Sequence, residues 1–599
     1  MLSRMQELGA VPDGDGRVRF SVWAPKRKRV DVVLDGRDFP LEPGPDGMFS
    51  ALLKAEPGQR YTLKVDGGDA FPDPCSRFQP EGPHGPSEVV DPSRYRWGDA
   101  DWKGAGPHGH VIYELHVGAF TKEGTYAALT ERLPYLKELG VTLLELMPLH
   151  DCPGTFNWGY DGVALFAPNH NYGTPDDLRR LVDRAHALGL GVILDVVYNH
   201  LGPDGNYLGQ FAEYHTHKYP DEWGAPLDFD GENAKHVRRF VTANAAAWVS
   251  EYHLDGLRLD ATQNLFDASE EHIVKSIARA ARDAAGGRSV FLTGESERQD
   301  AKLLDDGLDA IWVDDFHHVG RVIASGGAEG YMQDYEGSVR ELVACVLRNS
   351  IYQGQYYAWQ KHPRGTPLRQ VPHERAIFAL QNHDQIANSL DGRRLHALGG
   401  DSLTRALTSF FLLAPQTPML FMGQEYFAPQ PFYFFVDHGD ELAQAIAKGR
   451  RDFLSQFVTA RNAIYEEGAQ PPLGRPAFDA SRLDLSQAKD SAALRFHQEL
   501  LALRRRIVKH DAHFDAAVLG AASCCLRWPD HLVVLDFAND RQLNVPSEPL
   551  LAPPPGMKWK LAFSSELSRF GGRGAFASDG LGPWRVQGRA CTVLETTPR

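Results

Sequence analysis

The spacing of hydrophobic residues changes near residue 110. From Val18 to about Val65, short runs alternate apolar with polar residues and are separated by clusters of Pro, Gly and Asp. Runs of this kind, at 18–23, 30–34 and 61–65, are typical of half-buried strands joined by turns. Residues 66–109 are rich in Pro and Gly, which favours a connecting segment. Residues 1–90 are therefore expected to form an N-terminal β-sandwich, followed by a linker at 91–109.

From His110 onward, apolar strand-like runs alternate with amphipathic helical patterns. The eight runs begin near Val111, Val141, Leu190, Gly256, Ser289, Leu308, Ala376 and Pro418. Helical patterns lie between them, for example at 126–139, 176–188 and 233–252. Continuous apolar runs predict strands that are buried on both faces. Eight β/α repeats indicate an α/β fold with a closed (β/α)8 TIM barrel at 110–510, rather than an open doubly wound sheet.

A second change follows the helical pattern at 491–508, which is expected to close the barrel. Short strand-like runs at 516–519, 524–528, 532–537 and 591–595 predict a C-terminal β-sandwich domain over 511–599. A chain of 599 residues is too long for one hydrophobic core, so several domains are expected.

The composition of the chain argues against several classes of binding partner. The formal net charge of -15 argues against binding to nucleic acid or to an anionic membrane. The most apolar stretch, 410–422, is interrupted by Pro415 and Pro418 and is too short to span a bilayer. The first residues lack the apolar core of a signal peptide, and the six cysteines show neither metal-ligand spacing nor a disulfide framework. We therefore expect a cytoplasmic protein with no nucleic-acid or membrane partner.

Three carboxylates follow apolar runs within the predicted barrel: Asp260, Glu295 and Asp384. The carboxyl ends of barrel strands form the catalytic face of this fold, and cleavage of a glycosidic bond uses a pair of carboxyl groups. Arg258 precedes Asp260 by two residues and so points to the same side of its strand, where it would keep Asp260 ionised. A single Asp at a strand end is usually a cap or loop residue. The joint arrangement is what indicates glycoside cleavage.

Four segments in order resemble the sequence blocks of the α-amylase family of glycoside hydrolases. They are 195–200 (DVVYNH), 256–260 (GLRLD), 294–295 (GE) and 382–384 (NHD). The resemblance implies that Asp260 is the nucleophile, Glu295 the general acid/base and Asp384 the stabiliser of the transition state, with Asp195 in a supporting role. It further implies that the sugar being cleaved is bound by Tyr160, Asp161, His200, Arg258 and His383. Relatives hold calcium near the block that contains Asn199, but the supporting oxygen ligands are not evident in the sequence. We predict no required metal and no cofactor.

Flanking segments favour one branch of this family. The run 20–25 (FSVWAP) resembles the sandwich module that precedes the barrel in branching, debranching and trehalose-releasing enzymes. Segments 111–120, 195–207, 381–385 and 423–451 resemble the trehalose-releasing members. After Asp260 the chain reads Ala-Thr-Gln-Asn, where maltose-directed α-amylases commonly carry Lys-His. The implied reaction is hydrolysis, with retention, of the α-1,4 bond next to the terminal trehalose of malto-oligosyltrehalose.

The products implied by this resemblance are trehalose and a shortened maltodextrin. A functional partner would be the synthase that forms malto-oligosyltrehalose. Candidates for recognising the trehalose unit are the loop around Trp223 (221–226) and the segment 426–438. Two alternatives remain open from the sequence: a 1,4-α-glucan branching enzyme, and a non-catalytic glycan-binding barrel.

Overall fold

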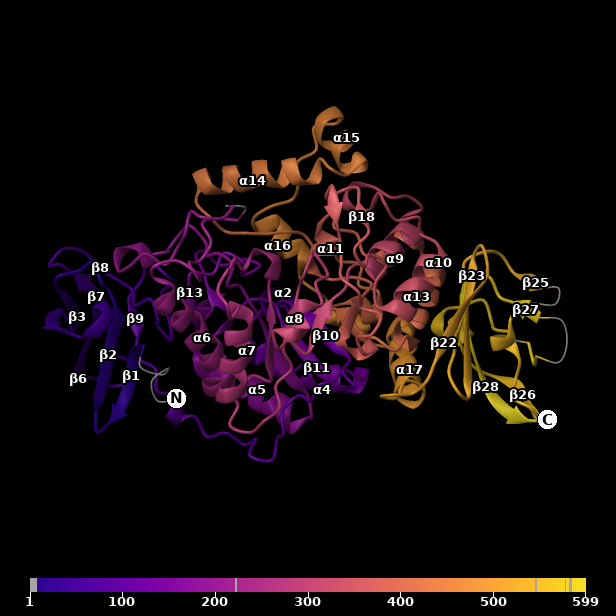
Figure 1. Ribbon diagram of the computed structural model, residues 1–599, viewed down its shortest axis with the longest axis horizontal. Coiled ribbons are helices and arrows are strands. Elements are labelled where there is room, and N and C mark those ends of the chain that lie inside the picture. The colour runs from indigo at the N-terminus through magenta and orange to yellow at the C-terminus, as the bar shows by residue number, and fades with distance from the viewer. Residues whose placement is uncertain (1–7, 221–222, 544–546, 577, 581–583) are drawn as a thin grey trace.

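Three parts follow one another along the length of the molecule. The computed structural model describes residues 8–220, 223–543, 547–576, 578–580 and 584–599. The N-terminal strands lie at one end, the barrel is central, and the C-terminal sheets lie at the other end (Figure 1). Residues 1–7, at the start of the predicted sandwich, lie outside the described residues.

The N-terminal part consists of two antiparallel sheets. Their strands are β1 (Gly9–Gly14), β2 (Arg17–Trp23), β3 (Val30–Leu34), β4 (Arg37–Pro40), β5 (Glu42–Pro43), β6 (Met48–Lys54), β7 (Arg60–Val65), β8 (Ala70–Phe71) and β9 (Ser87–Glu88). One sheet has the order β1-β2-β6-β5, and the other has β4-β3-β7-β8 with β9 also paired to β7. Alternate residues such as Val18, Phe20, Val30 and Val32 share one buried apolar core. The alternation read from the sequence is therefore the inner face of each sheet.

The central part is a closed barrel of eight parallel strands. They are β10 (Ile112–Leu115), β11 (Leu143–Leu146), β14 (Gly191–Val196), β15 (Gly256–Leu259), β16 (Thr293–Gly294), β17 (Ala310–Trp312), β20 (Ala376–Ala379) and β21 (Thr417–Phe421). They neighbour one another in this order, and β21 pairs with β10 to close the ring. Every residue in these strands is buried, because helices cover the outside and side chains fill the inside. The predicted fold class is confirmed.

Helices surround the barrel (Figure 1). They include α4 (Leu133–Leu139), α5 (Pro175–Ala187), α6 (Ala234–Glu251), α7 (Ile273–Ala284), α9 (Asp315–Ser325), α10 (Val339–Arg348), α13 (Asp401–Leu413) and α17 (Ala492–Ile507). Gly140 ends α4 in the left-handed region, at φ 107°, a conformation that favours glycine at this position.

Two predicted elements differ from the structure near the start of the barrel. The strand expected over 111–120 stops at Leu115, and residues 117–120 form the short helix α2 (Val117–Phe120). The helix expected over 126–139 is divided into α3 (Tyr126–Thr130) and α4. Pro134 explains the division, because proline lacks the N–H that would continue a helix yet suits the first turn of a new one.

A helical extension projects from the barrel. It consists of α14 (Asp440–Leu454) and α15 (Val458–Glu466), and α16 (Arg475–Ser481) leads back toward the body (Figure 1). Leu454 is the single buried residue of α14. Arg450 in α14 donates a hydrogen bond of 3.1 Å to Asn388, just after β20 and α11 (His383–Ala387). The extension therefore reaches over the end of the barrel at which β20 finishes.

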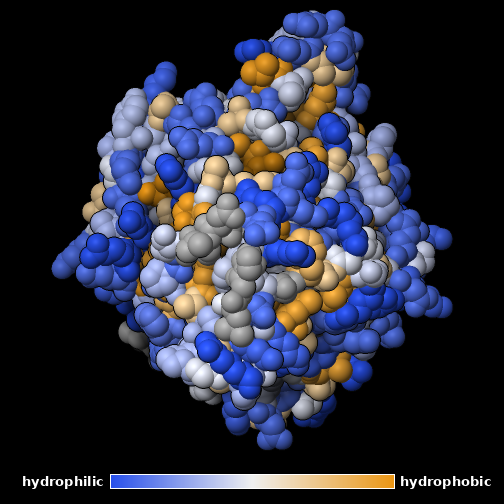
Figure 2. Space-filling view, turned by 90° about the vertical axis from the view of Figure 1, so that its right-hand side faces the viewer, coloured by the Kyte–Doolittle hydropathy of each residue, from blue (hydrophilic) through white to orange (hydrophobic). Residues whose placement is uncertain are grey.

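The C-terminal part packs its main sheet against α13. This sheet has the order β22 (Asp515–Gly520), β23 (Ser523–Arg527), β24 (His531–Asp536), β28 (Ala590–Pro598) and β26 (Met557–Ser564), and β25 (Arg541–Leu543) pairs with β27 (Trp584–Val586). The buried Trp528 donates an indole hydrogen bond of 3.2 Å to the Leu413 carbonyl. Hydrophilic residues cover most of this end of the molecule, with apolar residues in small separate groups (Figure 2). Among the helices of the described residues, none is long and apolar enough to cross a lipid bilayer.

Candidate active site

The three carboxylates predicted from the sequence come together at one end of the barrel. Asp260 follows β15 directly, Glu295 follows β16, and Asp384 lies in α11, which begins shortly after β20. β15 and β16 are neighbours in the barrel. The charge of Asp384 acts on both other carboxyl groups. The three side chains therefore form one cluster at the carboxyl ends of the strands, the end at which this fold places its active sites.

Arg258 joins two of these carboxylates from inside the barrel. Its Nη1 donates to Oδ1 of Asp260 at 2.7 Å, and its Nη2 donates to Oε2 of Glu295 at 2.8 Å. Nη1 also binds both oxygens of Asp195, at 2.8 and 2.7 Å. The guanidinium is fully buried and lies 4.2 Å from the centroid of the Trp312 ring. Charge-assisted bonds of this kind fix both the position and the orientation of a carboxylate.

The backbone next to Asp260 is held in an uncommon conformation. Ala261 has φ 38° and ψ 55°, in the left-handed region that residues with a side chain seldom enter. Its N–H donates to Oε2 of Glu295 at 3.1 Å, and the N–H of Thr262 donates to the Glu295 carbonyl at 3.0 Å. Such a conformation costs about 1–3 kcal/mol and persists where the surroundings over-determine it. Here it ties the two strand ends together.

Burial dominates the acidity of both strand-end carboxyl groups. Burial raises the pKa of Glu295 to about 7, with Arg258 opposing the shift and the charges of Asp260 and Asp384 adding to it. Burial also raises the pKa of Asp260, while Arg258 opposes this and a 3.1 Å hydrogen bond from Asn199 helps to oppose it. Glu295 is thus suited to hold a proton near neutral pH, as a general acid must.

This acidity predicts an alkaline limit to activity. Because a general acid must be protonated to act, kcat/KM is expected to fall as the pH rises through about 7, the raised pKa of Glu295. The loss should approach about tenfold per pH unit above that value. A pH–rate profile on a neutral oligosaccharide measures it. A kcat/KM that stays constant up to about pH 9 would contradict the assignment of the acid.

His383 is fixed from three sides. Its Nδ1 is hydrogen-bonded to Glu114, and its backbone N–H donates to the same carboxylate at 3.2 Å. Its Nε2 lies 2.8 Å from the Tyr160 hydroxyl and 3.4 Å from Asp384. Burial favours the neutral ring, but the carboxylates of Asp384 and Glu114 outweigh it and raise the pKa of His383 to about 9. A charged, oriented imidazolium therefore stands beside the carboxylate cluster.

Glu114 is expected to support activity through His383. Replacing Glu114 with Gln removes a hydrogen bond to a charged group, worth about 1.5–3 kcal/mol, while keeping the size of the side chain. We expect kcat/KM to fall about 10- to 100-fold, and circular dichroism should show an intact fold. Steady-state kinetics test this expectation, and an unchanged kcat/KM would mean that Glu114 does not position His383.

His200 and Asp161 lie together beside Tyr160. The ring of His200 is hydrogen-bonded to the Asn199 side chain, and Asp161 accepts from Asn157 at 3.2 Å and lies 3.0 Å from Nε2 of His438. The amide nitrogen of Asn199 donates to Asp260. Both ends of the Asn199 side chain are thus engaged, one with the carboxylate cluster and the other with His200.

Comparisons with known proteins agree with this geometry. Residues 90–224 match the family model described as alpha amylase, catalytic domain, and residues 7–92 match carbohydrate-binding module 48, the isoamylase N-terminal domain. A malto-oligosyltrehalose trehalohydrolase from Deinococcus radiodurans is 42% identical over 505 residues, which cover 83% of both chains. The chain belongs to the malto-oligosyltrehalose trehalohydrolase family. The resemblance stated from the sequence is confirmed.

This member of the trehalohydrolase family is also similar to a solved structure and to a branching enzyme. A crystal structure assigned to an alpha amylase from Salmonella typhimurium superimposes with a TM-score of 0.86 at 32% identity, covering 98% of this chain and all 100% of that chain. A 1,4-alpha-glucan branching enzyme from Rubrobacter xylanophilus is 36% identical over 531 residues, covering 81% of this chain and 71% of the relative. The Deinococcus radiodurans trehalohydrolase is more similar to this chain than the branching enzyme is, and the match covers more of that relative's length. The branching alternative is therefore not favoured.

The two segments predicted to recognise trehalose, 221–226 and 426–438, differ in whether they contact the residues of the site. In the loop 221–226, Trp223 is 59% exposed, and the contacts of the described residues do not connect it to the network around Arg258. Residues 221–222 of this loop are not among the described residues. In the segment 426–438, Tyr426 is buried, whereas His438 contacts Asp161. Among the described residues of these two segments, His438 is the one whose side chain contacts a predicted sugar-binding residue, Asp161.

Two further carboxylates near the cluster, Asp314 and Glu114, were missed. Asp314 follows β17, and burial raises its pKa to about 7, with Arg364 opposing and the charges of Glu295, Asp315 and Asp384 adding to the shift. The signal was present, because Asp314 follows an apolar run just as Asp260 does. Glu114 had a clearer signal: it is a charged residue inside an apolar barrel run.

Proposed function

We propose that this chain hydrolyses the α-1,4-glucosidic bond next to the terminal trehalose of malto-oligosyltrehalose, with retention of configuration. The products are trehalose and a shortened maltodextrin. The observation that carries the reaction type is the Arg258 guanidinium, which binds Asp260 through one terminal nitrogen and Glu295 through the other. That arrangement suits the short separation, about 5–5.5 Å, of the carboxyl pair in retaining glycosidases. Membership of the trehalohydrolase family supports the substrate.

In the first step Asp260 attacks the anomeric carbon while Glu295 protonates the departing glycosidic oxygen. The bond to the trehalose unit breaks, and a covalent glycosyl-enzyme forms on Asp260. Positive charge develops on the sugar ring in the transition state, and Asp384 stabilises it electrostatically. Asn199 and Arg258 hold Asp260 in position for the attack.

In the second step Glu295, now ionised, takes a proton from a water molecule. The resulting hydroxide attacks the same anomeric carbon, and the bond to Asp260 breaks to release the maltodextrin. The Arg258 contact and the Ala261 N–H are available to steady Glu295 in its ionised form. One carboxyl group with a pKa near neutrality can thus serve both steps.

The residues around His383 provide the binding surface for the sugar being cleaved. We assign contacts with this sugar to His383, Tyr160 and His200, while Arg258 anchors the carboxylates beneath it. Asp161, held by His438, adds a further acceptor. Preference for trehalose as leaving group requires polar groups that would remain unpaired with the wrong sugar. We assign that role to the loops on the same face, including the one that carries Trp223.

The alternative of a branching enzyme differs in the group that accepts the glycosyl unit. A branching enzyme transfers a chain to a glucan hydroxyl, whereas a hydrolase transfers it to water. Incubation with amylose separates the two. We expect little change in the iodine-staining spectrum, and a large shift without trehalose release from malto-oligosyltrehalose would overturn the proposal. The third possibility, a non-catalytic barrel, does not account for three clustered carboxylates, two of which are bound by the buried Arg258.

The wider setting follows from the substrate. A synthase that forms malto-oligosyltrehalose is the functional partner that the reaction requires. We place the reaction in residues 110–510, with the sandwich 1–90, the linker 91–109 and the domain 511–599 around it. The six cysteines, all within the described residues, are buried free thiols, which is in keeping with a reducing cytoplasm.

A further inference from the structure

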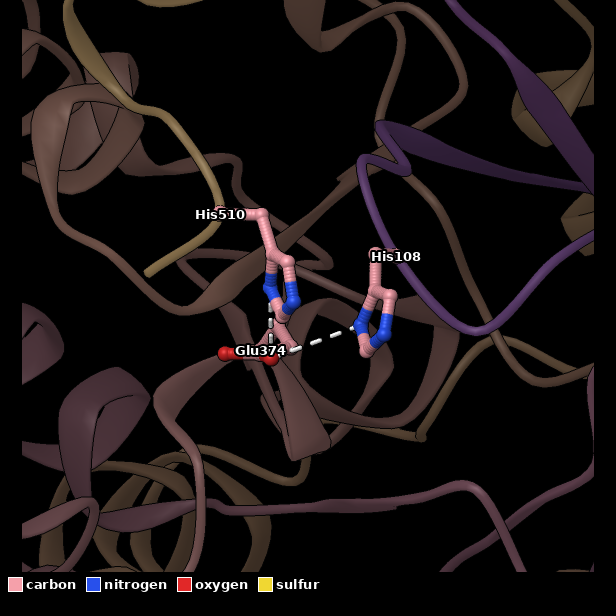
Figure 3. Close-up of side chains that lie close together, drawn as sticks. All are labelled: His108, Glu374 and His510. Atoms are coloured by element: carbon pink, nitrogen blue, oxygen red, sulfur yellow. Dashed lines mark ion pairs between the residues drawn. The ribbon is translucent and has the colours of Figure 1, made fainter. Parts of the chain in front are cut away.

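Two histidines and a glutamate converge at the end of the barrel opposite the carboxylate cluster. His108 precedes β10, Glu374 lies just before β20, and His510 follows α17 on the way to the C-terminal domain. These are the amino ends of the barrel strands, whereas the catalytic residues follow the carboxyl ends. The three residues are more than 100 positions apart from one another in the sequence. Figure 3 shows both imidazole rings turned toward the same carboxylate.

We propose that His108, Glu374 and His510 bind a divalent transition-metal ion, with Zn²⁺ as the best match. Nδ1 of His108 lies 3.3 Å, and Nδ1 of His510 3.1 Å, from the same oxygen of Glu374. Donor atoms around a tetrahedral Zn²⁺ with bonds of about 2.0–2.1 Å stand about 3.3 Å apart. Two of the three donor separations already have this value, and all three donor atoms lie within 4.8 Å of one another.

The other ring nitrogen of His510 supports this assignment. Its Nε2 lies 3.1 Å from Oδ2 of Asp511, so the ring faces a carboxylate at each nitrogen. With a metal ion between Nδ1 and Glu374, Nδ1 supplies its lone pair while Nε2 donates to Asp511. Histidine ligands usually donate their other N–H to a carboxylate, a backbone carbonyl or water, which fixes the ring and strengthens the ligand.

The donor set selects the kind of ion. Two imidazole nitrogens and one carboxylate oxygen suit Zn²⁺ and neighbouring transition metals, whereas Mg²⁺ and Ca²⁺ prefer oxygen ligands alone. The side chains of His108 and His510 are 42% and 47% exposed, so an ion can enter from solvent. Their rings stack with centroids 4.0 Å apart, and both Nδ1 atoms lie on the side that faces Glu374.

The proposed ion would join three segments at the base of the barrel. His108 belongs to the segment that enters the barrel, and His510 to the junction with the C-terminal domain. The ion would therefore have a stabilising role and take no part in the reaction. Because ligands bind the folded chain, occupancy should raise the midpoint of thermal unfolding.

Metal titration of the untagged full chain tests the proposal. After treatment with a chelator and its removal, ZnCl₂ is titrated at about pH 7.5, where free imidazole is largely neutral. We expect one Zn²⁺ per chain, a tetrahedral visible spectrum with Co²⁺ as substitute, and a Tm raised by a few degrees. In the double variant His108→Ala/His510→Ala the affinity should fall at least about tenfold and the Tm shift should vanish.

Two further variants sharpen the result. His513→Ala removes an exposed imidazole three residues from His510 and should bind Zn²⁺ as the unchanged chain does. Glu374→Gln should weaken binding without deleting a side chain, which keeps the test valid if the double variant folds poorly. Equal Zn²⁺ affinity in the unchanged chain and in both ligand variants would overturn the proposal, and so would the absence of binding to the unchanged chain at millimolar Zn²⁺. Activity measured in the presence of chelator should equal that with Zn²⁺.

Discussion

Replacing Asp260 with asparagine is expected to lower kcat by at least about 10⁴-fold, a loss of about 5 kcal/mol in transition-state stabilisation. The amide is nearly the same size as the carboxylate but does not attack the anomeric carbon, so the covalent intermediate does not form. Single-turnover and steady-state kinetics on malto-oligosyltrehalose measure the loss.

The fold should tolerate this change. Asp260 carries a pKa raised chiefly by burial, so its charge is unfavourable in the folded chain, and Arg258 keeps its contacts with Asp195 and Glu295. The Tm should be unchanged or higher. Asp314→Asn is the matched control, because it removes a carboxylate from the same face that has no assigned role in the attack. If both variants lost activity equally, the effect would be one of overall charge, and Asp260 would not be the nucleophile.

Replacing Glu295 with glutamine is expected to lower kcat on malto-oligosyltrehalose by about 10²- to 10⁴-fold, because the leaving oxygen is no longer protonated. A glucosyl substrate whose leaving group needs no proton, such as a fluoride, should recover most of the first step. The same substrate should not rescue Asp260→Asn, since that variant lacks the nucleophile. The two variants therefore separate the two roles.

The pH dependence of activity gives a second test of the Glu295→Gln variant. The alkaline limb expected near pH 7, the raised pKa of Glu295, should be absent from the residual activity of Glu295→Gln. A limb that persisted at the same pH would assign the acid to another group. Asp314 would then be the first to examine, because burial also raises its pKa to about 7.

Much of the architecture could be predicted because buried strands leave an unbroken apolar signal. All eight barrel strands begin within a few residues of the predicted runs, although β16 extends over only Thr293–Gly294. The predicted elements were wrong where an apolar segment adopts a backbone conformation other than the expected one. Residues 117–120 are as apolar as the strand before them but turn into α2, because periodicity over four residues does not distinguish a helix from a strand.

The composition of the site was less predictable than its location. Asp260, Glu295 and Asp384 could be identified because each follows a strand. The reach of Arg258 from Asp260 to Glu295 depends on how neighbouring strands are staggered in the barrel, which no local pattern records. Glu114 contacts His383 across 269 residues of sequence, so its role was visible only in the folded chain. The exposed position of Trp223 likewise depends on the path of a long loop.

The central claim is that trehalose is the leaving group, and product analysis on a matched pair of substrates tests it most directly. Maltopentaosyl-trehalose and maltoheptaose have the same number of glucose units and the same linkages except at one end, where an α,α-1,1 linkage in the first replaces an α-1,4 bond of the second. We predict rapid release of trehalose from the first, with maltopentaose as the other product, and little attack on the second. Comparable cleavage of both substrates, or cleavage of the first without free trehalose, would contradict the account.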